Sequence, residues 1–315
     1  MKSDRAGGLR RALCGVAVAV LAGPAMAQPR PGPLAMETHA LRGGAYWISG
    51  GRSNDGFVVG PQGVVVLDAG ISAAEAKMEQ AEIAKVTSKP VSAIVVTHAD
   101  PDHVLGLLYY PTSTPVFMQE NARSEVVAAA NDPAAPPAYK ALYAQLVERL
   151  PRDTVGRELV TTLGGVRVVL RHYGPAHTAG DLVMYLPDLK IVYGGDLLVN
   201  YTQFPVIHLA GSSLGWEDSM KAILALDADT YIPGHGPILS KAELASRLRD
   251  EQTRREQIKA MVVQGKTLAE IEQALPDKTE DPMFITYTEG VYAELTRGFP
   301  PPNPPWNNIV KRPHG

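Results

Sequence analysis

Short apolar runs alternate with polar segments along most of the chain. Four of these runs consist largely of β-branched and other apolar residues next to glycine, proline or polar clusters, which is typical of buried strands. They are residues 91–96, 166–170, 190–193 and 230–232. Because α/β proteins commonly place their chemistry on loops at the carboxyl ends of strands, the residues after each run are the first candidates for a site.

Helical patterns occupy several segments between and after these runs. Residues 72–88 are rich in alanine and glutamate. Residues 121–150 contain two candidate helices, separated by the Asn-Asp-Pro sequence at 131–133. Residues 241–260 form a charged amphipathic pattern with leucine and isoleucine on or near one face. No internal repeat or coiled-coil register accompanies these patterns.

The amino terminus has the pattern of a secretory signal. Basic residues up to Arg11 precede an apolar stretch, residues 12–22, and the Ala-Met-Ala sequence at 25–27 supplies a cleavage site. This pattern predicts a cleavable signal peptide, residues 1–27, and a periplasmic or secreted protein. A membrane anchor is not expected, because the apolar stretch has about eleven residues against the ~20 needed to span a bilayer. Sec and twin-arginine export both stay open.

Composition agrees with an ordinary globular enzyme. The chain has 315 residues, 45% of them hydrophobic and 20% charged, which is enough for one large core or two modest ones. With a net charge of −3 and no cluster of basic and aromatic residues, no nucleic-acid partner is expected. Cys14 is the only cysteine and lies in the predicted signal peptide, so no disulfide is expected. Residues 28–37 are expected to be a flexible leader, and residues 300–305 an irregular proline-rich tail.

Potential metal ligands cluster directly after the strand-like runs. Residues 98–103, His-Ala-Asp-Pro-Asp-His, place four of them within six positions after the first run. His177, Asp196 and His235 follow or end the other three runs, each bracketed by glycine or proline. Imidazole and carboxylate groups together bind zinc, manganese or iron, and seven such groups suffice for two ions that share a bridging carboxylate. The pattern therefore predicts a metal centre at these strand ends.

This arrangement resembles the signature of the metallo-β-lactamase-fold superfamily, which reads His-x-His-x-Asp-His followed by His, Asp and His. The resemblance covers residues 54–236, and residues 54–60 and 64–70 are similar to the family's opening hairpin. It implies an α/β fold, a four-layer αββα sandwich that forms a single domain over residues 38–315. Asp68 matches the acidic residue beneath the family's metal centre.

The resemblance also assigns the ligands. It places His98, Asp100 and His177 around one ion, and Asp102, His103 and His235 around the other, with Asp196 bridging the two. The expected cofactor is zinc, as two ions, with iron or manganese as alternatives. Any one of these histidines alone is better explained as a hydrogen-bonded loop residue. The set as a whole favours a metal site.

Asp100 departs from the family pattern, which usually has its second histidine there. A carboxylate is shorter than an imidazole and adds a negative charge, so the metal should shift towards the loop or be held through water. The less positive centre should also acidify a bound water less strongly. Oxygen-rich ligation favours harder ions, which keeps iron and manganese open beside zinc.

Other residues near the motifs receive supporting roles. Asp102 is the expected catalytic residue, which orients the attacking water and passes its proton to the leaving group. Thr178 and Asp181 are expected to hold His177 in place. Three more residues are candidates for lining the pocket, although core or loop packing explains them equally well: Tyr201, His208 and Trp216.

The leading interpretation is a periplasmic metal-dependent hydrolase of a small ester, lactone, amide or related bond, with a small-molecule substrate. A β-lactamase of the histidine-ligated type is an alternative, but Asp196 argues against it, since those enzymes generally lack this aspartate. An exported metal-binding accessory or redox protein without hydrolytic turnover is an alternative of another class, and Asp100 keeps it open. The sequence leaves the substrate and the oligomeric state undecided.

Overall fold

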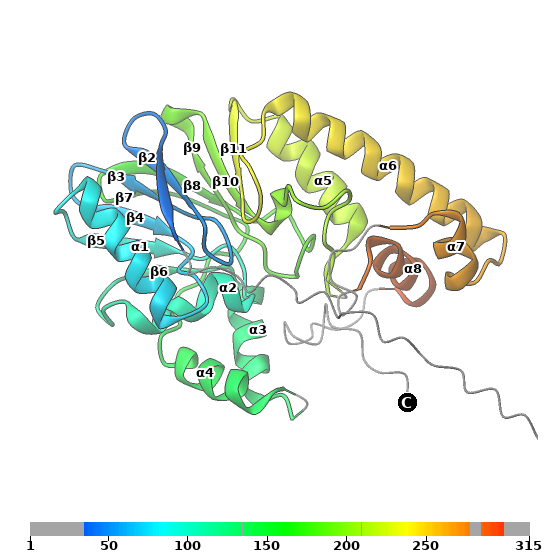
Figure 1. Ribbon diagram of the computed structural model, residues 1–315, viewed down its shortest axis with the longest axis horizontal. Coiled ribbons are helices and arrows are strands. Elements are labelled where there is room, and N and C mark those ends of the chain that lie inside the picture. The colour runs from blue at the N-terminus through cyan, green and yellow to red at the C-terminus, as the bar shows by residue number, and fades with distance from the viewer. Residues whose placement is uncertain (1–34, 134, 209, 278–284, 299–315) are drawn as a thin grey trace, which may run out of the picture. The chain divides into compact units, whose positions relative to one another are not determined.

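Two β-sheets lie face to face, with helices on their outer sides (Figure 1). The computed structural model describes residues 35–133, 135–208, 210–277 and 285–298, which all belong to one structural unit. The first sheet has six strands in the order β1-β2-β3-β4-β5-β6, and the second has five in the order β11-β10-β9-β8-β7. The strands are β1 (Glu37–Ala40), β2 (Ala45–Ser49), β3 (Asp55–Val59), β4 (Val64–Leu67), β5 (Val91–Val95), β6 (Val116–Phe117), β7 (Glu158–Leu163), β8 (Val166–Arg171), β9 (Val183–Leu186), β10 (Ile191–Gly195) and β11 (Thr230–Pro233).

Helices and 3-10 turns connect the strands. The α-helices are α1 (Ala73–Val86), α2 (Pro101–Val104), α3 (Glu120–Asn131), α4 (Pro137–Val147), α5 (Ser213–Leu224), α6 (Lys241–Val263), α7 (Leu268–Ala274) and α8 (Tyr287–Arg297). The 3-10 helices are η1 (Leu105–Tyr109), η2 (Pro187–Leu189) and η3 (Asp196–Leu198).

The alternation of side chains along the strands creates three apolar layers. On β4, Val65 and Leu67 point into the layer between the sheets, where they join Ile191 and Tyr193 of β10. Residues of α1 pack on the outer face of the first sheet, and the same apolar layer continues to α3 and α4 at its edge. Residues of α5, α6 and α8 cover the outer face of the second sheet. Each sheet is thus buried on both faces, which confirms the four-layer αββα fold.

The elements predicted from periodicity are present. All four strand-like runs form strands, β5, β8, β10 and β11. The three helical patterns correspond to α1, to α3 with α4, and to α6. The hairpin implied by the resemblance is β3 paired antiparallel with β4, with Gly56 opposite Leu67. β4 and β5 run parallel, as do β10 and β11, so their carboxyl ends lie at the same edge of each sheet.

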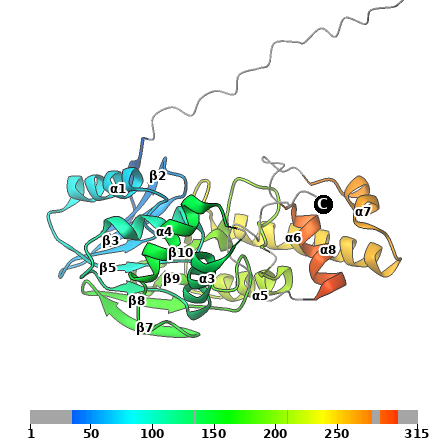
Figure 2. The ribbon, with the colours of Figure 1, turned by 90° about the horizontal axis from the view of Figure 1, so that it is seen from below.

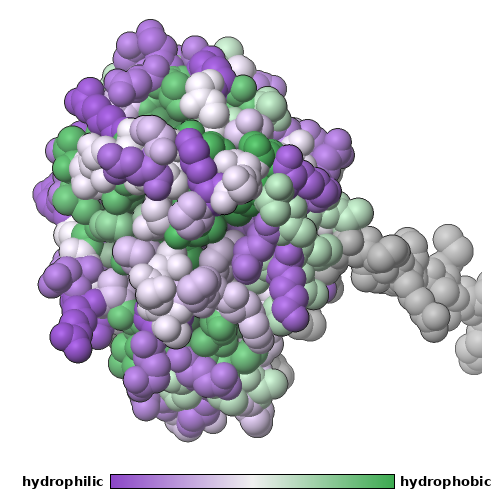
Figure 3. Space-filling view, turned by 90° about the vertical axis from the view of Figure 1, so that its left-hand side faces the viewer, coloured by the Kyte–Doolittle hydropathy of each residue, from purple (hydrophilic) through white to green (hydrophobic). Residues whose placement is uncertain are grey.

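Helices α2, α3 and α4 lie along one edge of the sheets (Figures 1 and 2). That edge carries the loops after β5, β10 and β11, where the sequence predicts metal ligands. Figure 3 shows the molecule from the left-hand side of Figure 1, where hydrophilic side chains are interspersed with apolar patches.

Several predictions from sequence concern the chain ends. The predicted signal peptide, residues 1–27, and the proline-rich tail, residues 300–305, lie outside the described residues. The same holds for residues 28–34 of the predicted leader, whereas Glu37 is the first residue of β1. Within the described ranges, no helix combines the length and apolar character needed to cross a membrane.

Candidate metal centre

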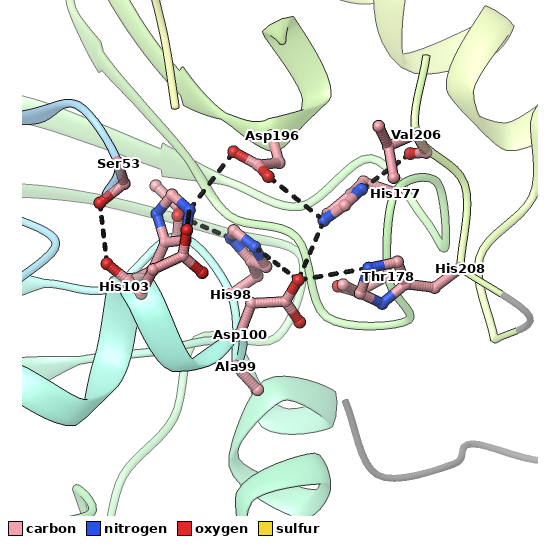
Figure 4. Close-up of polar contacts among 12 residues, drawn as sticks. Ser53, His98, Ala99, Asp100, His103, His177, Thr178, Asp196, Val206 and His208 are labelled. Carbon is pink, nitrogen blue, oxygen red and sulfur yellow. Dashed lines mark hydrogen bonds and ion pairs between the residues drawn. The ribbon is translucent and has the colours of Figure 1, made fainter. Parts of the chain in front are cut away.

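The predicted ligands come from both sheets and meet at one edge. His98 and Asp100 lie on the loop after β5, and His103 follows in α2. Asp196 directly follows β10, and His235 lies just after β11. His177 reaches the same place from the loop between β8 and β9. Figure 4 shows the side chains of the labelled histidines and aspartates directed towards one another.

The first ligand group consists of His98, Asp100 and His177. The Nε2 atoms of both histidines lie 3.5 Å from Oδ2 of Asp100. All three side chains are buried. In a tetrahedral site with metal bonds of about 2.0–2.1 Å, neighbouring donor atoms lie about 3.3–3.4 Å apart. The first ligand group therefore has the spacing that one transition-metal ion requires.

The second ligand group consists of Asp102, His103 and His235. Oδ2 of Asp102 lies 3.3 Å from Nε2 of His235 and 3.8 Å from Nε2 of His103. The side chains of Asp102 and His235 keep 24% and 21% exposure, so solvent reaches this group more readily than the first. This spacing also suits a single ion.

Asp196 lies between the two groups. Its Oδ1 is 3.4 Å from Nε2 of His103, and its Oδ2 is 3.3 Å from Nε2 of His235. The same Oδ2 is 3.7 Å from Nε2 of His177, which belongs to the first group. A carboxylate that approaches donors of both groups is in the place that a bridging ligand would occupy, as the resemblance implies.

The ring nitrogens of three histidines show that the set fits a metal. Nε2 of His98, His103 and His177 is buried and has no hydrogen-bond partner among the described residues. The opposite nitrogen, Nδ1, contacts an oxygen in each ring, at 2.9 Å for His98, 2.8 Å for His103 and 2.8 Å for His177. An Nδ1–H that donates to oxygen leaves the Nε2 lone pair free, as in metal-bound histidines. A cation would satisfy all three orphaned atoms at once.

Asp68 orients two of these rings from below. Its Oδ2 accepts a hydrogen bond from Nδ1 of His103 at 2.8 Å. The Thr97 hydroxyl donates to the same carboxylate at 2.8 Å and accepts from Nδ1 of His98. Asp68 adopts a left-handed backbone with φ of 61°. A strained residue kept at the carboxyl end of β4 is typical of a functional site, in agreement with the role that the resemblance gives Asp68.

The carboxylates and imidazoles shift one another's proton affinities. Burial alone would lower the pKa of His177, but Asp100 and Asp196 outweigh it and raise that pKa to about 9. Burial likewise opposes protonation of His235, yet Asp196 and Asp102 raise its pKa to about 10. The positive charge of the protonated rings thus offsets the negative charge of the carboxylates. A bound metal ion would take over this role and displace the protons.

Thr178 and Asp181 hold the turn after His177, whereas Trp216 does not line a pocket. Thr178 donates from its hydroxyl to Asp181 at 2.7 Å and from its backbone N–H at 3.1 Å, which fixes the turn after His177. Trp216 of α5 is a core residue, because its ring is buried in the apolar layer on the second sheet and its Nε1 donates to the Leu197 carbonyl at 2.8 Å.

The other two candidate pocket residues lie near the ligands. The ring of Tyr201 stands 5.5 Å from that of His235 and is 46% exposed. His208 is buried, and its Nε2 lies 3.2 Å from Oδ2 of Asp100. Burial lowers the pKa of His208, against the opposing effect of Asp100.

Some supporting residues are absent from the sequence analysis. Tyr143 of α4 donates to the Ala99 carbonyl at 2.8 Å, and Glu125 of α3 accepts from the Ala179 N–H at 3.3 Å. Burial, followed by the charges of Asp181 and Asp100, raises the pKa of Glu125 to about 8. Helices α3 and α4 therefore help to hold the loops that carry the predicted ligands. No local motif marks these residues, since each acts through a distant part of the chain.

Comparison with known proteins identifies the family. A model of the metallo-beta-lactamase superfamily matches residues 48–235, and the chain belongs to that superfamily. The match spans both ligand groups and Asp196, so the resemblance found in the sequence is confirmed.

Curated relatives are similar over part of their length. The linear primary-alkylsulfatase of Pseudomonas sp. (strain ATCC 19151) is 25% identical over 233 residues, which cover 61% of this chain and 43% of the relative. The alpha subunit of 2,4-dinitroanisole O-demethylase of Nocardioides sp. (strain JS1661) is 26% identical over 212 residues, which cover 66% of this chain and 60% of the relative. The chain thus spans about half the length of these curated relatives.

Solved structures agree on the fold. A metallo-beta-lactamase from Pontibacter korlensis superposes with a TM-score of 0.57 at 21% identity, covering 69% of this chain and 99% of that one. A stereoselective inverting sec-alkylsulfatase from Pseudomonas sp. gives a TM-score of 0.64 at 16% identity, covering 82% of this chain and 50% of that one. At these identities the likeness concerns the αββα architecture alone.

Proposed function

We propose that the protein is a metal-dependent hydrolase that cleaves a small ester, lactone, amide or related bond at a centre of two transition-metal ions. The observation that carries this proposal is the pair of ligand groups that share Asp196 and present orphaned Nε2 atoms. His98, Asp100 and His177 would hold one ion, and Asp102, His103 and His235 the other. Two such ions supply a hydroxide nucleophile at neutral pH and polarise the bond under attack.

Asp102 is the residue best placed to handle the proton. Burial opposes its ionisation, but the charges of His103 and His235 outweigh burial and lower the pKa of Asp102. Its carboxylate is therefore ionised at neutral pH and can accept the proton of an attacking water. The Ser53 hydroxyl donates to the Asp102 carbonyl at 2.8 Å and fixes the backbone beneath it. With 24% of its side chain exposed, Asp102 can pass the proton to a leaving group in solvent.

The names of the relatives guide the choice of substrates. One is an alkylsulfatase and the other an O-demethylase of 2,4-dinitroanisole, so alkyl sulfates and an aryl methyl ether belong in the test beside carboxylic esters and lactones. Nitrocefin tests the β-lactamase alternative, which the presence of Asp196 at the junction of the ligand groups disfavours.

We further propose a periplasmic location. The basic residues, the apolar stretch and the Ala-Met-Ala sequence of residues 1–27 support it. Fractionation of cells that produce the full chain, with amino-terminal sequencing of the product, tests this point. We expect a periplasmic protein that begins at Gln28, and an unprocessed product in the cytosol would overturn the proposal.

The test of function compares the protein loaded with zinc, manganese or iron against this substrate panel. The wild-type protein should bind two ions and hydrolyse at least one ester-like substrate. Asp102→Asn should lower kcat by at least 100-fold at saturating metal, in line with the loss of a general base. Asp188→Asn is the matched control, because this aspartate is 69% exposed on η2 between β9 and β10. Metal binding without turnover of any substrate would favour the accessory-protein alternative.

A further inference from the structure

His208 is a buried histidine whose polar atoms are not used by the rest of the fold. It is 2% exposed, and neither Nδ1 nor Nε2 has a hydrogen-bond partner among the described residues. The carboxylate of Asp100 lies beside the ring, with its Oδ2 3.2 Å from Nε2 of His208. Burial of two unsatisfied ring nitrogens costs free energy, so a ligand at this position would explain why the ring is kept.

The backbone around His208 is fixed against the loop that carries His177. The N–H of His208 donates to the His177 carbonyl at 2.9 Å, and Nδ1 of His177 lies 2.8 Å from the Val206 carbonyl oxygen. The Ser212 N–H donates to the Ala176 carbonyl at 2.8 Å. A side chain at Gly211 would lie 2.2 Å from the same carbonyl oxygen, so the close approach requires glycine. The two imidazole rings are thereby held with centroids 4.3 Å apart.

Three imidazole nitrogens converge on one oxygen without bonding to it. Nε2 of His98, His177 and His208 lies 3.5, 3.5 and 3.2 Å from Oδ2 of Asp100. The three nitrogens approach this oxygen as ion-pair partners, and none of them is aligned with it in a well-formed hydrogen bond. The distances instead resemble the separations between neighbouring donors around one ion, about 3.3–3.4 Å. Figure 4 shows His98 and His208 on two sides of the Asp100 carboxylate.

We propose that His208 is a further ligand of the ion held by the first ligand group. The proposal rests on the metal centre of the proposed function. With His208 the group contains three imidazoles and one carboxylate rather than two imidazoles and one carboxylate. A nitrogen-rich set is better suited to zinc than an oxygen-rich one, so His208 removes the reason for preferring iron or manganese at Asp100. The neutral ring also adds a donor without adding a charge.

The test measures cobalt(II) binding to the full chain in competition with a chelator. His208→Ala and His208→Asn should each weaken the binding of one of the two ions at least tenfold and leave the other unchanged. His39→Asn is the matched control, because His39 is a partly buried histidine of β1 that contacts Ser49. The asparagine variant keeps an N–H that can donate to Asp100 but supplies no imidazole. Wild-type affinity for both ions in His208→Asn would overturn the proposal.

A second measurement uses the wild-type protein and does not depend on the folding of a variant. An imidazole bound to cobalt(II) through Nε2 carries an Nδ1–H whose proton resonance the paramagnetic ion shifts strongly. We expect such a resonance for His208 beside those of His98 and His177. Its absence while the other two are present overturns this proposal alone, whereas a wild-type protein that binds no cobalt overturns the metal centre as well.

Discussion

A single carboxylate, Asp68, orients two of the predicted ligands, His98 and His103. It accepts from Nδ1 of His103 directly and from His98 through the Thr97 hydroxyl, so both rings present the unprotonated Nε2 to the centre. A further bond runs from the Thr97 N–H to Oδ1 of Asp68 at 2.8 Å. With all of these bonds formed at a buried position, the carboxylate has little freedom to turn.

Asp68→Asn tests this role. Asparagine tolerates the left-handed backbone of position 68, so the change affects mainly the charge and one acceptor. The orienting partners of metal-bound histidines typically contribute 10–100-fold to metal affinity, and we expect a loss of that size. Chelator competition measures it, with Asp188→Asn as the control. Unchanged affinity for both ions would show that the rings are oriented without Asp68.

The raised pKa values of His177 and His235 predict proton release on metal binding. In the metal-free protein these values are about 9 and about 10, so both rings are protonated at pH 7.5. Ligation requires neutral rings, and binding should therefore release protons and become tighter as pH rises towards 9. Calorimetry in buffers of different ionisation enthalpy measures the release. His235→Asn should release fewer protons than the wild type, and buffer-independent heats in the wild type would contradict the prediction.

The same shifts give the pH dependence of the metal-free fold. An unfolded histidine has a pKa of about 6.5, below both folded values. The stabilisation of the metal-free fold by protonated His177 and His235 is therefore complete below about pH 6.5. It is lost as the pH rises through the folded pKa values of about 9 and about 10. Urea unfolding of the chelated protein at pH 6 and pH 9.5 should show the lower free energy of unfolding at pH 9.5. A flat profile would contradict the shifts.

The hydrophobic periodicity of the sequence predicted the strands and helices that have strong local patterns. The apolar runs gave β5, β8, β10 and β11 because these strands are largely buried. β7 was not predicted, because most of its residues alternate only between exposed and partly buried, with Val160 55% exposed. Helices α7 and α8 were not predicted, although the sequence contains a capping box at the start of each. The capping boxes are formed by Thr267 with Glu270 and by Thr286 with Glu289.

The ligand motifs were predictable because each is local, whereas His208 was not assignable from sequence. Residues 199–212 contain no helix or strand in their described part, so their path depends on tertiary contacts such as the bond from the His208 N–H to the His177 carbonyl. Spacing along the chain carries no trace of such a bond. The same reason explains why Tyr143 and Glu125 were missed.

Helix α8 braces the segment that leads away from His208. The Ser212 hydroxyl donates to Oε1 of Glu294 at 3.0 Å, and the Ser213 N–H donates to Oε2 at 2.9 Å. Bonds to a charged group contribute roughly 1.5–3 kcal/mol each, so loss of these two bonds in Glu294→Ala should lower the free energy of unfolding by roughly 3–6 kcal/mol. The same variant should also bind one metal ion less tightly and leave the affinity for the other ion unchanged.

Asp188→Ala on η2 serves as the control, because Asp188 is 69% exposed and pairs with Arg167, which is itself 58% exposed. Urea unfolding and chelator competition give the two readouts for Glu294→Ala. An equal loss of affinity for both ions would show that α8 stabilises the fold in general rather than the His208 segment.

At the scale of the molecule, the metal centre joins the two sheets. The loop after β5 belongs to the first sheet, while the loops that carry His177, Asp196 and His235 belong to the second. Protein hydrogen bonds also cross this junction: the Asn54 side chain donates to the carbonyls of Pro233 at 3.0 Å and Gly236 at 2.7 Å, and the Leu182 N–H donates to the Thr97 carbonyl at 2.7 Å. Ions bound by ligands of both sheets would add bonds across the same junction.

Removal of the metals should therefore destabilise the whole fold. A ligand present at about 1,000 times its Kd stabilises the folded state by about 4 kcal/mol. For a domain of this size each kcal/mol shifts the Tm by about 2–4 °C, so loss of one ion should lower the Tm by roughly 10 °C and chelation of both ions by roughly 20 °C. Differential scanning calorimetry with and without EDTA measures the shift, and added zinc should reverse it. His103→Ala, which should retain about one ion, is expected to show a smaller shift on chelation. An EDTA-treated wild type that melts at the original temperature would mean that the sheets hold together at this edge through protein contacts such as those of Asn54 alone.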